Sequence, residues 1–156
     1  MLKNIPPILS PEILKVLCEM GHSDRICIGD VNFPGTAMAK AEGAILLRAD
    51  GHGIPELLDA ILQVFPLDAY VETPAMLMEK MERDKDLEIP VWEQYKDIIA
   101  KHDSRGETAV GAYERFEFYE QAKKCYCILQ TGETAIYANI ILQTGVIYLI
   151  FSKPPR

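Results

Sequence analysis

The sequence predicts a single three-layer α/β/α domain over residues 1–156, in which helices cover both faces of a mixed or largely parallel β-sheet. Apolar segments of strand length alternate along the chain with segments whose apolar residues recur at helical spacing. No internal repeat or low-complexity segment interrupts this alternation. A chain of 156 residues is also long enough to bury most of its apolar surface without disulfides or a structural metal.

The first helix is predicted to start at Ser10-Pro11-Glu12. This tripeptide combines a hydroxyl N-cap, a proline at the first helical position and an acid near the positive end of the helix dipole. Apolar residues then recur at helical spacing until Gly21, which supplies the stop. His22, a titratable side chain, therefore follows the C-terminal end of this helix.

A short apolar strand is predicted at residues 26–28, and Asp30 and Asn32 lie just past its end. Ligands of open α/β sheets bind outside the carboxyl ends of the strands. The sequence therefore predicts a site for a small polar substrate at Asp30 and Asn32. We also expect His22 and Asp24 to share this site, because they flank the same strand.

A βα unit is predicted in the next part of the chain. Residues 36–44 fit either a short helix or a loop, and residues 44–47 fit a buried strand. The turn Asp-Gly-His-Gly at residues 50–53 then leads into a helix near Pro55. The turn matches neither GxxxxGK[ST] nor GxGxxG, so we expect its glycines to make the turn and Asp50 to cap the helix.

The remaining elements follow from the same patterns of apolar spacing, capping residues and breakers. They are a strand at 68–71, a methionine-rich strand at 75–78 that runs into a charged, solvated excursion at 79–88, a helix at 90–101, a strand at 109–113, a helix at 115–124, and strands at 125–129, 137–142 and 146–151.

Charge and hydropathy exclude several classes of partner. A formal net charge of −7 disfavours nucleic acid, because binding to phosphates requires clustered Lys and Arg. The N-terminal residues 1–10 contain two prolines and no long apolar run, which predicts neither a signal peptide nor a membrane span. A cytoplasmic location is the expectation.

The four cysteines, Cys18, Cys27, Cys125 and Cys127, form no CxxC motif and fall in apolar segments. In a reducing compartment such residues are typically buried thiols. Cys125 and Cys127 would share one face of a strand and could in principle hold a metal. A zinc site needs a second ligand pair, however, and none is apparent in the sequence.

The catalytic motifs that are absent narrow the chemistry. The sequence contains no nucleophile elbow, Walker motif, HExxH or dinucleotide fingerprint. What remains is a set of acid–base side chains: His22, Asp24, Asp30, Asp68, Tyr119 and Tyr137. Residue chemistry alone therefore indicates either a cofactor-free acid–base enzyme or a binder of small polar ligands.

Five motifs in order resemble the RbsD/FucU sugar mutarotase family, and its fucose branch and animal members in particular. They are MLKNIPPILSPEILKVLCEMGHSD at the N-terminus, DVNFP at 30–34, RADG at 48–51, ERFEFYE at 114–120 and TGETAIYANIIL at 131–142. The resemblance extends from Met1 to about Gly145. It implies an RbsD-like fold and interconversion of the α and β anomers of L-fucose, an isomerase activity that needs no cofactor and no metal. It also implies a homo-oligomer with sites completed across subunit contacts.

The resemblance also assigns roles to individual residues. His22 matches the histidine that acts as proton donor in the family. The positions that contact the sugar or assist proton transfer are matched by Asp30, Asp68, Arg115, Tyr119, Tyr137 and Asn139.

These residue types suit the implied reaction. Opening a pyranose ring requires removal of the proton from the anomeric hydroxyl and protonation of the ring oxygen, and closure on the other face of the aldehyde reverses both transfers. Histidine suits such a role because imidazoles in model peptides have a pKa of about 6.5. The hypothesis is that His22 serves the ring oxygen while Tyr119 or Tyr137 relays the anomeric proton.

Three alternatives remain open at this point. Ala138, between Tyr137 and Asn139, resembles the ribose-type branch of the family, so the sugar could be ribose. A non-catalytic sugar-binding or transport-accessory module would use the same aspartates and aromatic residues without proton transfer by His22. A phosphohydrolase built on Asp30 and the turn at residues 50–53 is the third possibility, and it lacks a magnesium or phosphate motif.

Overall fold

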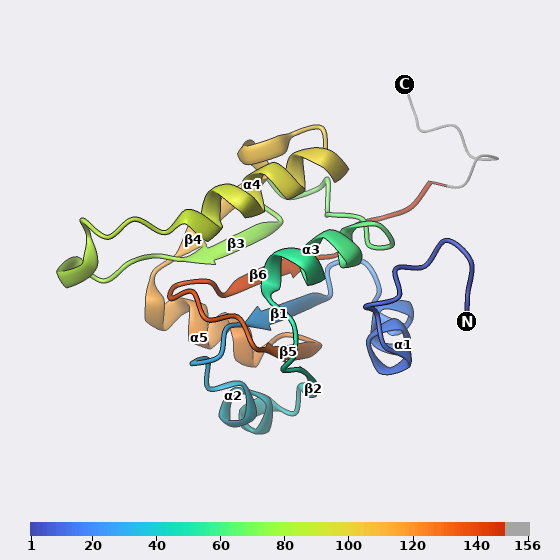
Figure 1. Ribbon diagram of the computed structural model, residues 1–156, viewed down its shortest axis with the longest axis horizontal. Helices are drawn as coiled ribbons and strands as arrows, with labels where there is room; N and C mark the ends of the chain where they lie inside the picture. The colour runs from blue at the N-terminus through green and yellow to red at the C-terminus, as the bar shows by residue number, and fades with distance from the viewer. Residues whose placement is uncertain (149–156) are drawn as a thin grey trace.

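A mixed β-sheet forms the centre of the molecule (Figure 1). The computed structural model describes residues 1–148, and within them the strands lie in the order β2-β5-β1-β6-β3-β4. β6 runs antiparallel to both of its neighbours, β1 and β3, whereas the other pairs are parallel. The strands are β1 (Arg25–Gly29), β2 (Ile45–Ala49), β3 (Ala75–Met78), β4 (Val110–Tyr113), β5 (Cys127–Thr131) and β6 (Ile140–Gln143).

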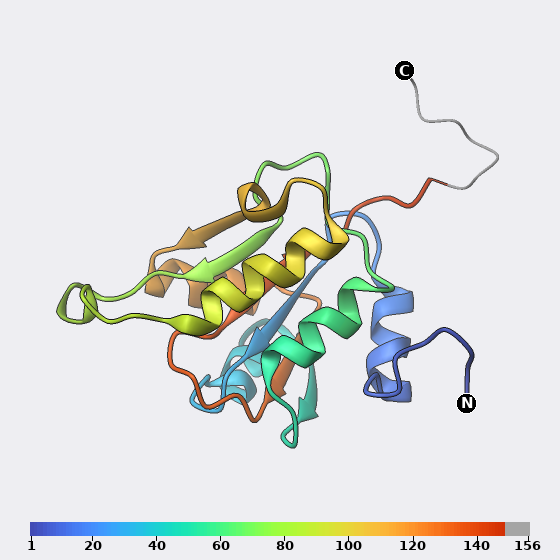
Figure 2. The ribbon, with the colours of Figure 1, turned by 45° about the horizontal axis from the view of Figure 1, so that its top comes forward.

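Helices cover both faces of this sheet, which confirms the predicted α/β/α architecture (Figures 1 and 2). One apolar cluster contains side chains of α1 (Pro11–Glu19), α3 (Ile54–Leu62) and α4 (Pro90–His102). The opposite cluster contains side chains of α2 (Gly35–Glu42) and α5 (Arg115–Lys123). Successive strand residues point to opposite faces. Within β1, accordingly, Ile26 and Ile28 join the first cluster and Cys27 joins the second.

Local sequence accounts for the helix boundaries. The Ser10 hydroxyl accepts a hydrogen bond of 3.2 Å from the backbone N–H of Ile13 at the start of α1, as predicted. The segment that fitted either a helix or a loop forms α2, which ends at Gly43 with φ of 83°. A left-handed residue is strained unless it is glycine, so Gly43 suits this C-cap. No helix within residues 1–148 has the length and apolarity needed to cross a membrane.

The predicted strand at residues 68–71 is wrong. Only Leu67 forms a β-bridge there, with Thr144. The Asp68 carboxylate accepts a hydrogen bond of 2.9 Å from the backbone N–H of Tyr70. This local bond bends the chain into a turn, which competes with strand formation.

Two further strands start later than predicted. β5 begins at Cys127 rather than Cys125, because the Cys125 N–H still bonds to the Ala122 carbonyl in the last turn of α5. β6 begins at Ile140 rather than Tyr137, because Tyr137 has φ of 55° and cannot lie in a strand. Of the last predicted strand, residues 146–148 have no regular structure and residues 149–151 lie outside the described residues.

The prediction that Asp50 caps α3 is wrong. Its carboxylate instead accepts two hydrogen bonds from Arg48, of 2.6 and 3.0 Å. The first N–H groups of the helix are satisfied by two other carboxylates. Glu56 accepts from the N–H of Gly53 at 3.2 Å, and Glu133, from the loop after β5, accepts from the N–H of Ile54 at 3.0 Å.

The directions of the strands distinguish one edge of the sheet from the other. The five parallel strands all end at this edge, and the antiparallel strand β6 begins there. Loops from several strands therefore converge outside the carboxyl ends, the position at which open α/β sheets bind ligands.

Candidate functional site

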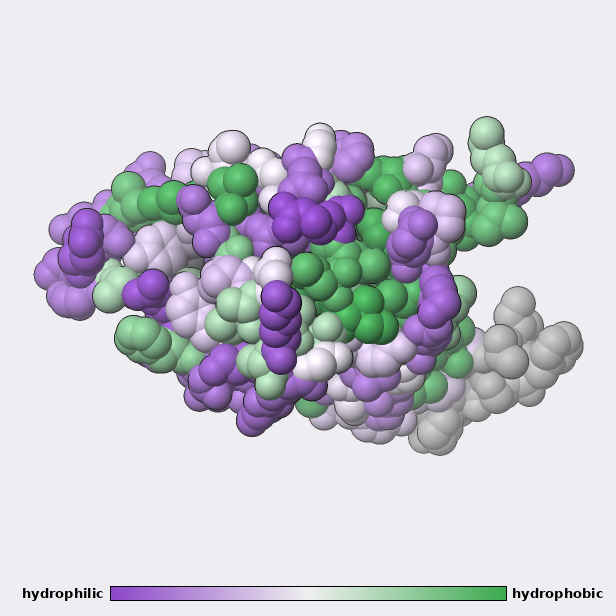
Figure 3. Space-filling model, turned by 90° about the horizontal axis from the view of Figure 1, so that it is seen from below, coloured by the Kyte–Doolittle hydropathy of each residue, from purple (hydrophilic) through white to green (hydrophobic). Residues whose placement is uncertain are grey.

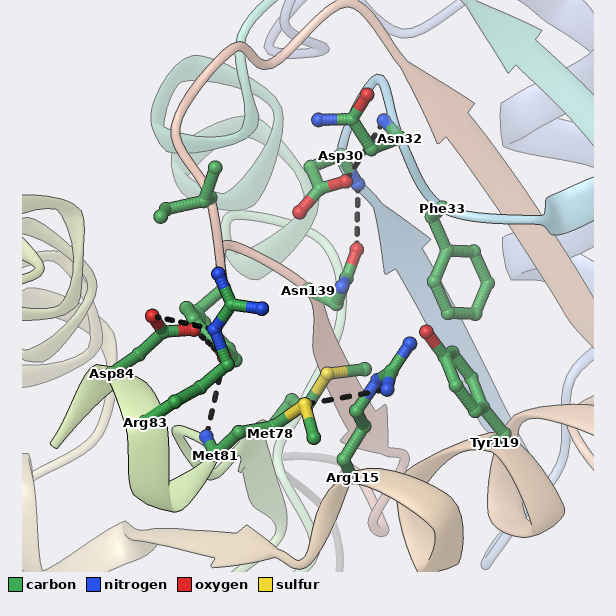
Figure 4. Close-up of a pocket in the computed structure, with 12 residues that line it drawn as sticks. Asp30, Asn32, Phe33, Met78, Met81, Arg83, Asp84, Arg115, Tyr119 and Asn139 are labelled. Carbon is green, nitrogen blue, oxygen red and sulfur yellow. Dashed lines mark hydrogen bonds and ion pairs between the residues drawn. The ribbon is translucent and has the colours of Figure 1, made fainter.

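An open pocket of about 390 Å³ lies at this edge, within the size range of small-molecule sites (Figure 4). Its lining comes from the loop after β1, the segment after β3, the start of α5 and the loop before β6. The lining residues are Asp30, Asn32, Phe33, Met78, Met81, Arg83, Asp84, Arg115, Tyr119, Ile136, Tyr137 and Asn139. Five of the residues predicted for the site, Asp30, Arg115, Tyr119, Tyr137 and Asn139, thus lie together.

Asp30 ties two of these loops together. Its side chain is 3% exposed, and its two carboxylate oxygens accept hydrogen bonds from the N–H of Asn32 at 3.0 Å and the N–H of Ala138 at 3.3 Å. Burial raises the pKa of Asp30 above its ordinary value, and the backbone hydrogen bonds oppose this shift only in part. The carboxyl group is therefore easier to protonate than a surface aspartate.

Asn139 is oriented by the backbone of Asp30. The Asp30 N–H donates to the Asn139 side chain at 2.7 Å, and an N–H donor requires the amide oxygen as its acceptor (Figure 4). The NH₂ group is therefore the part of Asn139 that can donate to a ligand. Since Asn139 is also buried, its position is set by the fold.

Aromatic rings and a guanidinium form another part of the wall (Figure 4). The rings of Phe33 and Tyr119 lie 5.9 Å apart, and the Arg115 guanidinium lies 5.5 Å from the Tyr119 ring. Arg115 and Tyr119 project from the first turns of α5, which is capped by Glu114. This wall offers an apolar surface and several N–H donors, a combination suited to the C–H face and hydroxyl groups of a sugar.

Tyr137 is held by three hydrogen bonds. Its hydroxyl donates to Asp84 Oδ2 at 2.6 Å and accepts from the N–H of Met81 at 3.2 Å. Its carbonyl accepts from Trp92 Nε1 at 2.7 Å. The hydrogen bond to Asp84 raises the pKa of Tyr137 above its ordinary value. A left-handed backbone at a residue other than glycine is costly, so its presence in a pocket suggests a functional role.

Six lining residues were missed by the sequence analysis, namely Phe33, Met78, Ile136, Met81, Arg83 and Asp84. The last three lie in the segment after β3, residues 79–89, which we call the arm and which projects from the body of the molecule (Figure 1). The Lys80 ammonium donates to the carbonyls of Lys85 and Leu87, both at 2.8 Å, and so closes the arm on itself. The high charge of this segment indicated solvation, although its position after the carboxyl end of a strand was a signal for function.

His22 and Asp68 lie outside this pocket. His22 Nε2 is 3.1 Å from Asp68 Oδ1, and Gln143, the last residue of β6, donates to Asp68 Oδ2 at 2.9 Å. This pair therefore lies at the opposite edge of the sheet from Asp30. A five-residue strand such as β1 is about 17 Å long. The expectation that His22 and Asp30 meet within one chain is wrong.

Asp24 is also at the opposite edge, where its carboxylate accepts from the N–H of Gly21 at 2.8 Å. Asp24 thus closes the turn between α1 and β1 and does not reach the pocket.

Asp68 holds the imidazole of His22 in place. Burial raises the pKa of Asp68, but hydrogen bonds from Tyr70, Gln143 and His22 outweigh burial, so the net pKa is lower than usual. The His22 side chain is 43% exposed, and its ring lies 5.2 Å from that of Tyr70. Because Nε2 faces Asp68, Nδ1 is the ring nitrogen left for other contacts.

Fold and pocket together define the class of protein: an α/β domain with a mixed sheet that presents a polar, small-ligand pocket at the carboxyl ends of its strands. A family model confirms and sharpens this class. The chain belongs to the RbsD / FucU transport protein family, whose model matches residues 3–147.

Individual relatives are similar over almost the whole chain. The chain is 47% identical over 150 residues to human fucose mutarotase, covering 95% of this chain and 96% of that protein. Crystal structures of FucU from Bifidobacterium longum, at 55% identity and a TM-score of 0.90, and of the fucose mutarotase from Streptococcus pneumoniae in complex with L-fucose, at 43% identity and a TM-score of 0.86, each align with 94% of this chain and 100% of theirs.

Proposed function

We propose that this protein is an L-fucose mutarotase, an isomerase that interconverts the α and β anomers of L-fucopyranose. The pocket at the carboxyl edge of the sheet carries this proposal, because it gathers a buried carboxyl group, an amide, a guanidinium and two phenols within one small cavity. The similarity to fucose mutarotases from end to end supports it.

Each pocket group has a proposed role in holding the sugar. The Asn139 NH₂ group and the Arg115 guanidinium donate to sugar hydroxyls, while free lone pairs on the Asp30 carboxylate accept from them. The rings of Phe33 and Tyr119 contact the apolar face of the sugar. The pocket binds the sugar in one orientation and leaves the anomeric hydroxyl near a phenol.

We further propose that His22 of one copy of the chain completes the pocket of another copy. His22 lies too far from the pocket of its own chain, yet its imidazole is partly exposed and held by the buried Asp68. Large apolar side chains near this end of the sheet are also exposed, including Tyr70, Ile147 and Tyr148. These features suit a contact between copies and make a homo-oligomer the working form.

A second apolar surface supports assembly. β2 is an edge strand, and its residues Ile45, Leu46 and Leu47 are only partly buried. Hydrophobic side chains gather on this face of the molecule (Figure 3). An exposed apolar edge strand readily pairs with another chain. In the proposed oligomer, that chain is a second copy of this protein.

In the proposed reaction, His22 of the partner copy donates a proton to the ring oxygen as the bond between that oxygen and the anomeric carbon breaks. A pocket phenol takes up the proton of the anomeric hydroxyl, which becomes the aldehyde oxygen. Rotation of the aldehyde and the reverse transfers close the ring as the other anomer. Positioned acid–base groups typically accelerate a reaction about 10²–10⁴-fold.

Saturation-transfer NMR on an equilibrium mixture of L-fucose anomers tests the function, with ribose and galactose alongside. Irradiation of one fucose anomer should deplete the other in the presence of wild-type protein. His22→Ala should abolish this transfer. His52→Ala is the matched control, because His52 is a partly exposed histidine outside the pocket whose imidazole bonds to Glu56 near the start of α3. Binding of fucose without exchange would support a sugar-binding or transport-accessory module instead.

A complementation experiment tests the shared site. At a fucose concentration well below KM, His22→Ala and Arg115→Ala proteins should each be much less active alone than the wild type. Co-expressed in one oligomer, they should regain activity, since about a quarter of randomly assembled sites then combine an intact pocket with an intact His22. A mixture as inactive as its components would refute the shared site. The mutarotase proposal would still be tested by the NMR measurement on the wild-type protein.

We also propose a cytoplasmic location. The four cysteines, Cys18, Cys27, Cys125 and Cys127, are free thiols in the structure, as is common in a reducing compartment. Cell fractionation with a specific antibody would test this, and recovery of the protein from a secretory fraction would contradict it.

A further inference from the structure

The contact between Tyr137 and Asp84 restricts what Tyr137 can do in the pocket. Asp84 is the last residue of a short 3₁₀ helix, η1 (Glu82–Asp84), in the arm. The Tyr137 hydroxyl donates its only hydrogen to Asp84 Oδ2 at 2.6 Å and accepts one hydrogen bond from the N–H of Met81 at 3.2 Å. A phenol has one hydrogen and two lone pairs. One lone pair therefore remains, and Tyr137 can meet a sugar hydroxyl only as an acceptor.

Tyr119, the other phenol of the pocket, has a different environment. Its ring lies beside the Arg115 guanidinium and the Phe33 ring. Within residues 1–148, its hydroxyl has no carboxylate partner. A neutral phenol can take up a proton only if it passes its own proton to a base. Tyr137 has such a base at hydrogen-bond distance, and Tyr119 does not.

We propose that Asp84 acts through Tyr137 as the final acceptor of the anomeric proton. This inference rests on the proposed mutarotase function and names a residue and a route within it. In ring opening, the anomeric O–H bond breaks and its proton bonds to Tyr137 Oη. The original Tyr137 proton moves to Asp84 Oδ2. The bond between the anomeric carbon and the ring oxygen breaks, and its electron pair takes a proton from His22 of the partner copy.

The balance of this step needs no other reactant. Asp84 begins as a carboxylate and ends as a carboxylic acid, while His22 begins as an imidazolium and ends neutral. Ring closure on the other face of the aldehyde returns both protons. Because Tyr137 gains one proton as it loses another, it need not exist as a phenolate, which suits a phenol whose pKa is raised by its hydrogen bond to Asp84.

The surroundings of Asp84 fit a proton acceptor. Its side chain is 29% exposed, and its Oδ1 atom lies 3.6 Å from the Nε atom of Arg83. The guanidinium therefore lies beside Oδ1 and leaves Oδ2, the oxygen that faces Tyr137, to the phenol. Asp84 and Arg83 both line the pocket, so the relay lies next to the proposed sugar site (Figure 4).

Asp84→Asn separates proton transfer from positioning. The asparagine oxygen can still accept the hydrogen bond from Tyr137, but an amide does not take up a proton at neutral pH. The expected result is a fall in kcat of about 10²–10⁴-fold with KM close to that of the wild type. Asp86→Asn is the matched control, because Asp86 is an exposed aspartate of the same arm and outside the fucose pocket. It should keep the wild-type kcat.

Three further measurements exclude a merely structural role. Asp84→Glu keeps a carboxylate and should restore part of the lost kcat. Tyr137→Phe should lower kcat to a similar extent, and the double variant with Asp84→Asn should be no slower than the slower single variant, because both changes break one relay. In an ultraviolet titration, Asp84→Asn should also lower the pKa of Tyr137, which this carboxylate raises.

The outcomes distinguish this inference from the function on which it rests. Wild-type kcat in Asp84→Asn, or a higher KM with unchanged kcat, would overturn the relay while leaving the mutarotase intact. Wild-type protein that binds fucose without exchanging its anomers would overturn the function, and the relay with it.

Discussion

The indole N–H of Trp92 donates a hydrogen bond of 2.7 Å to the carbonyl of Tyr137, so α4 holds a pocket residue in its left-handed conformation. Trp92→Phe removes this donor and leaves the carbonyl without its partner. We expect a loss of about 1 kcal/mol in the free energy of unfolding and a lower kcat, because the phenol is no longer fixed. Urea unfolding and anomer-exchange rates measure the two effects. If Trp92→Phe lost the expected stability but kept the wild-type kcat, Tyr137 would be positioned by other contacts.

Asp68→Asn tests the carboxylate that holds His22. The pKa of Asp68 is lower in the folded protein than its ordinary value of 3.8, so its ionised form stabilises the fold above that pH. This stabilisation disappears as the pH falls through the lower pKa of the folded state. The free energy of unfolding of the wild type should therefore fall more steeply than that of Asp68→Asn below about pH 4.

The control for this prediction is Asp97→Asn, at an exposed position of α4. Its curve of unfolding free energy against pH should follow that of the wild type. Urea unfolding at a series of acid pH values gives all three curves. Parallel curves for the wild type and Asp68→Asn would contradict the assigned role of the hydrogen bonds to Asp68.

Gly132→Ala tests the close approach of two loops beside the pocket. A methyl group at Gly132 would clash with the carbonyl oxygen of Asp50, a backbone atom. We expect a loss of about 1–3 kcal/mol in stability, as for other overpacked sites. Gly51→Ala is the control, because a methyl group there meets no atom within 4 Å. Similar midpoints of thermal unfolding for both variants would contradict this packing.

Arg115→Ala tests the proposed role of the guanidinium in sugar binding. Loss of a hydrogen bond from a charged donor should raise KM about 10-fold or more, while the fold remains intact. Lys40→Ala is the control, because Lys40 is an exposed cation of α2 outside the pocket. Steady-state anomer exchange measures both. An equal rise in KM for the two variants would indicate a general effect of positive charge.

Much of the fold could be predicted because its signals are local. The cap at Ser10, the proline of α4 and the apolar spacing of α3 place helices without reference to the rest of the chain. The order of strands in the sheet depends on contacts between distant residues. Pairing of β1 with both β5 and β6 is such a contact, and no local pattern indicates it.

The candidate site was predicted in part for the same reason. Asp30 could be found because it follows a recognisable strand. The separation of His22 from it was missed because both flank that strand in sequence, and a strand holds its two ends apart. Asp84 was missed because its role depends on the loop before β6, 53 positions away in the chain.

The pocket is lined partly by the sheet and its loops and partly by the arm, and these two parts differ in how well they tolerate substitutions. Asp30 and Asn139 are tied into the sheet, where a substitution also disturbs the packing of the core. Met81 and Arg83 project from a surface loop whose residues 79–88 contribute none of the buried side chains of the core. Surface loops tolerate substitution and changes of length. Sugar preference can therefore evolve in the arm while the part of the pocket tied to the sheet, and the stability of the domain, are preserved.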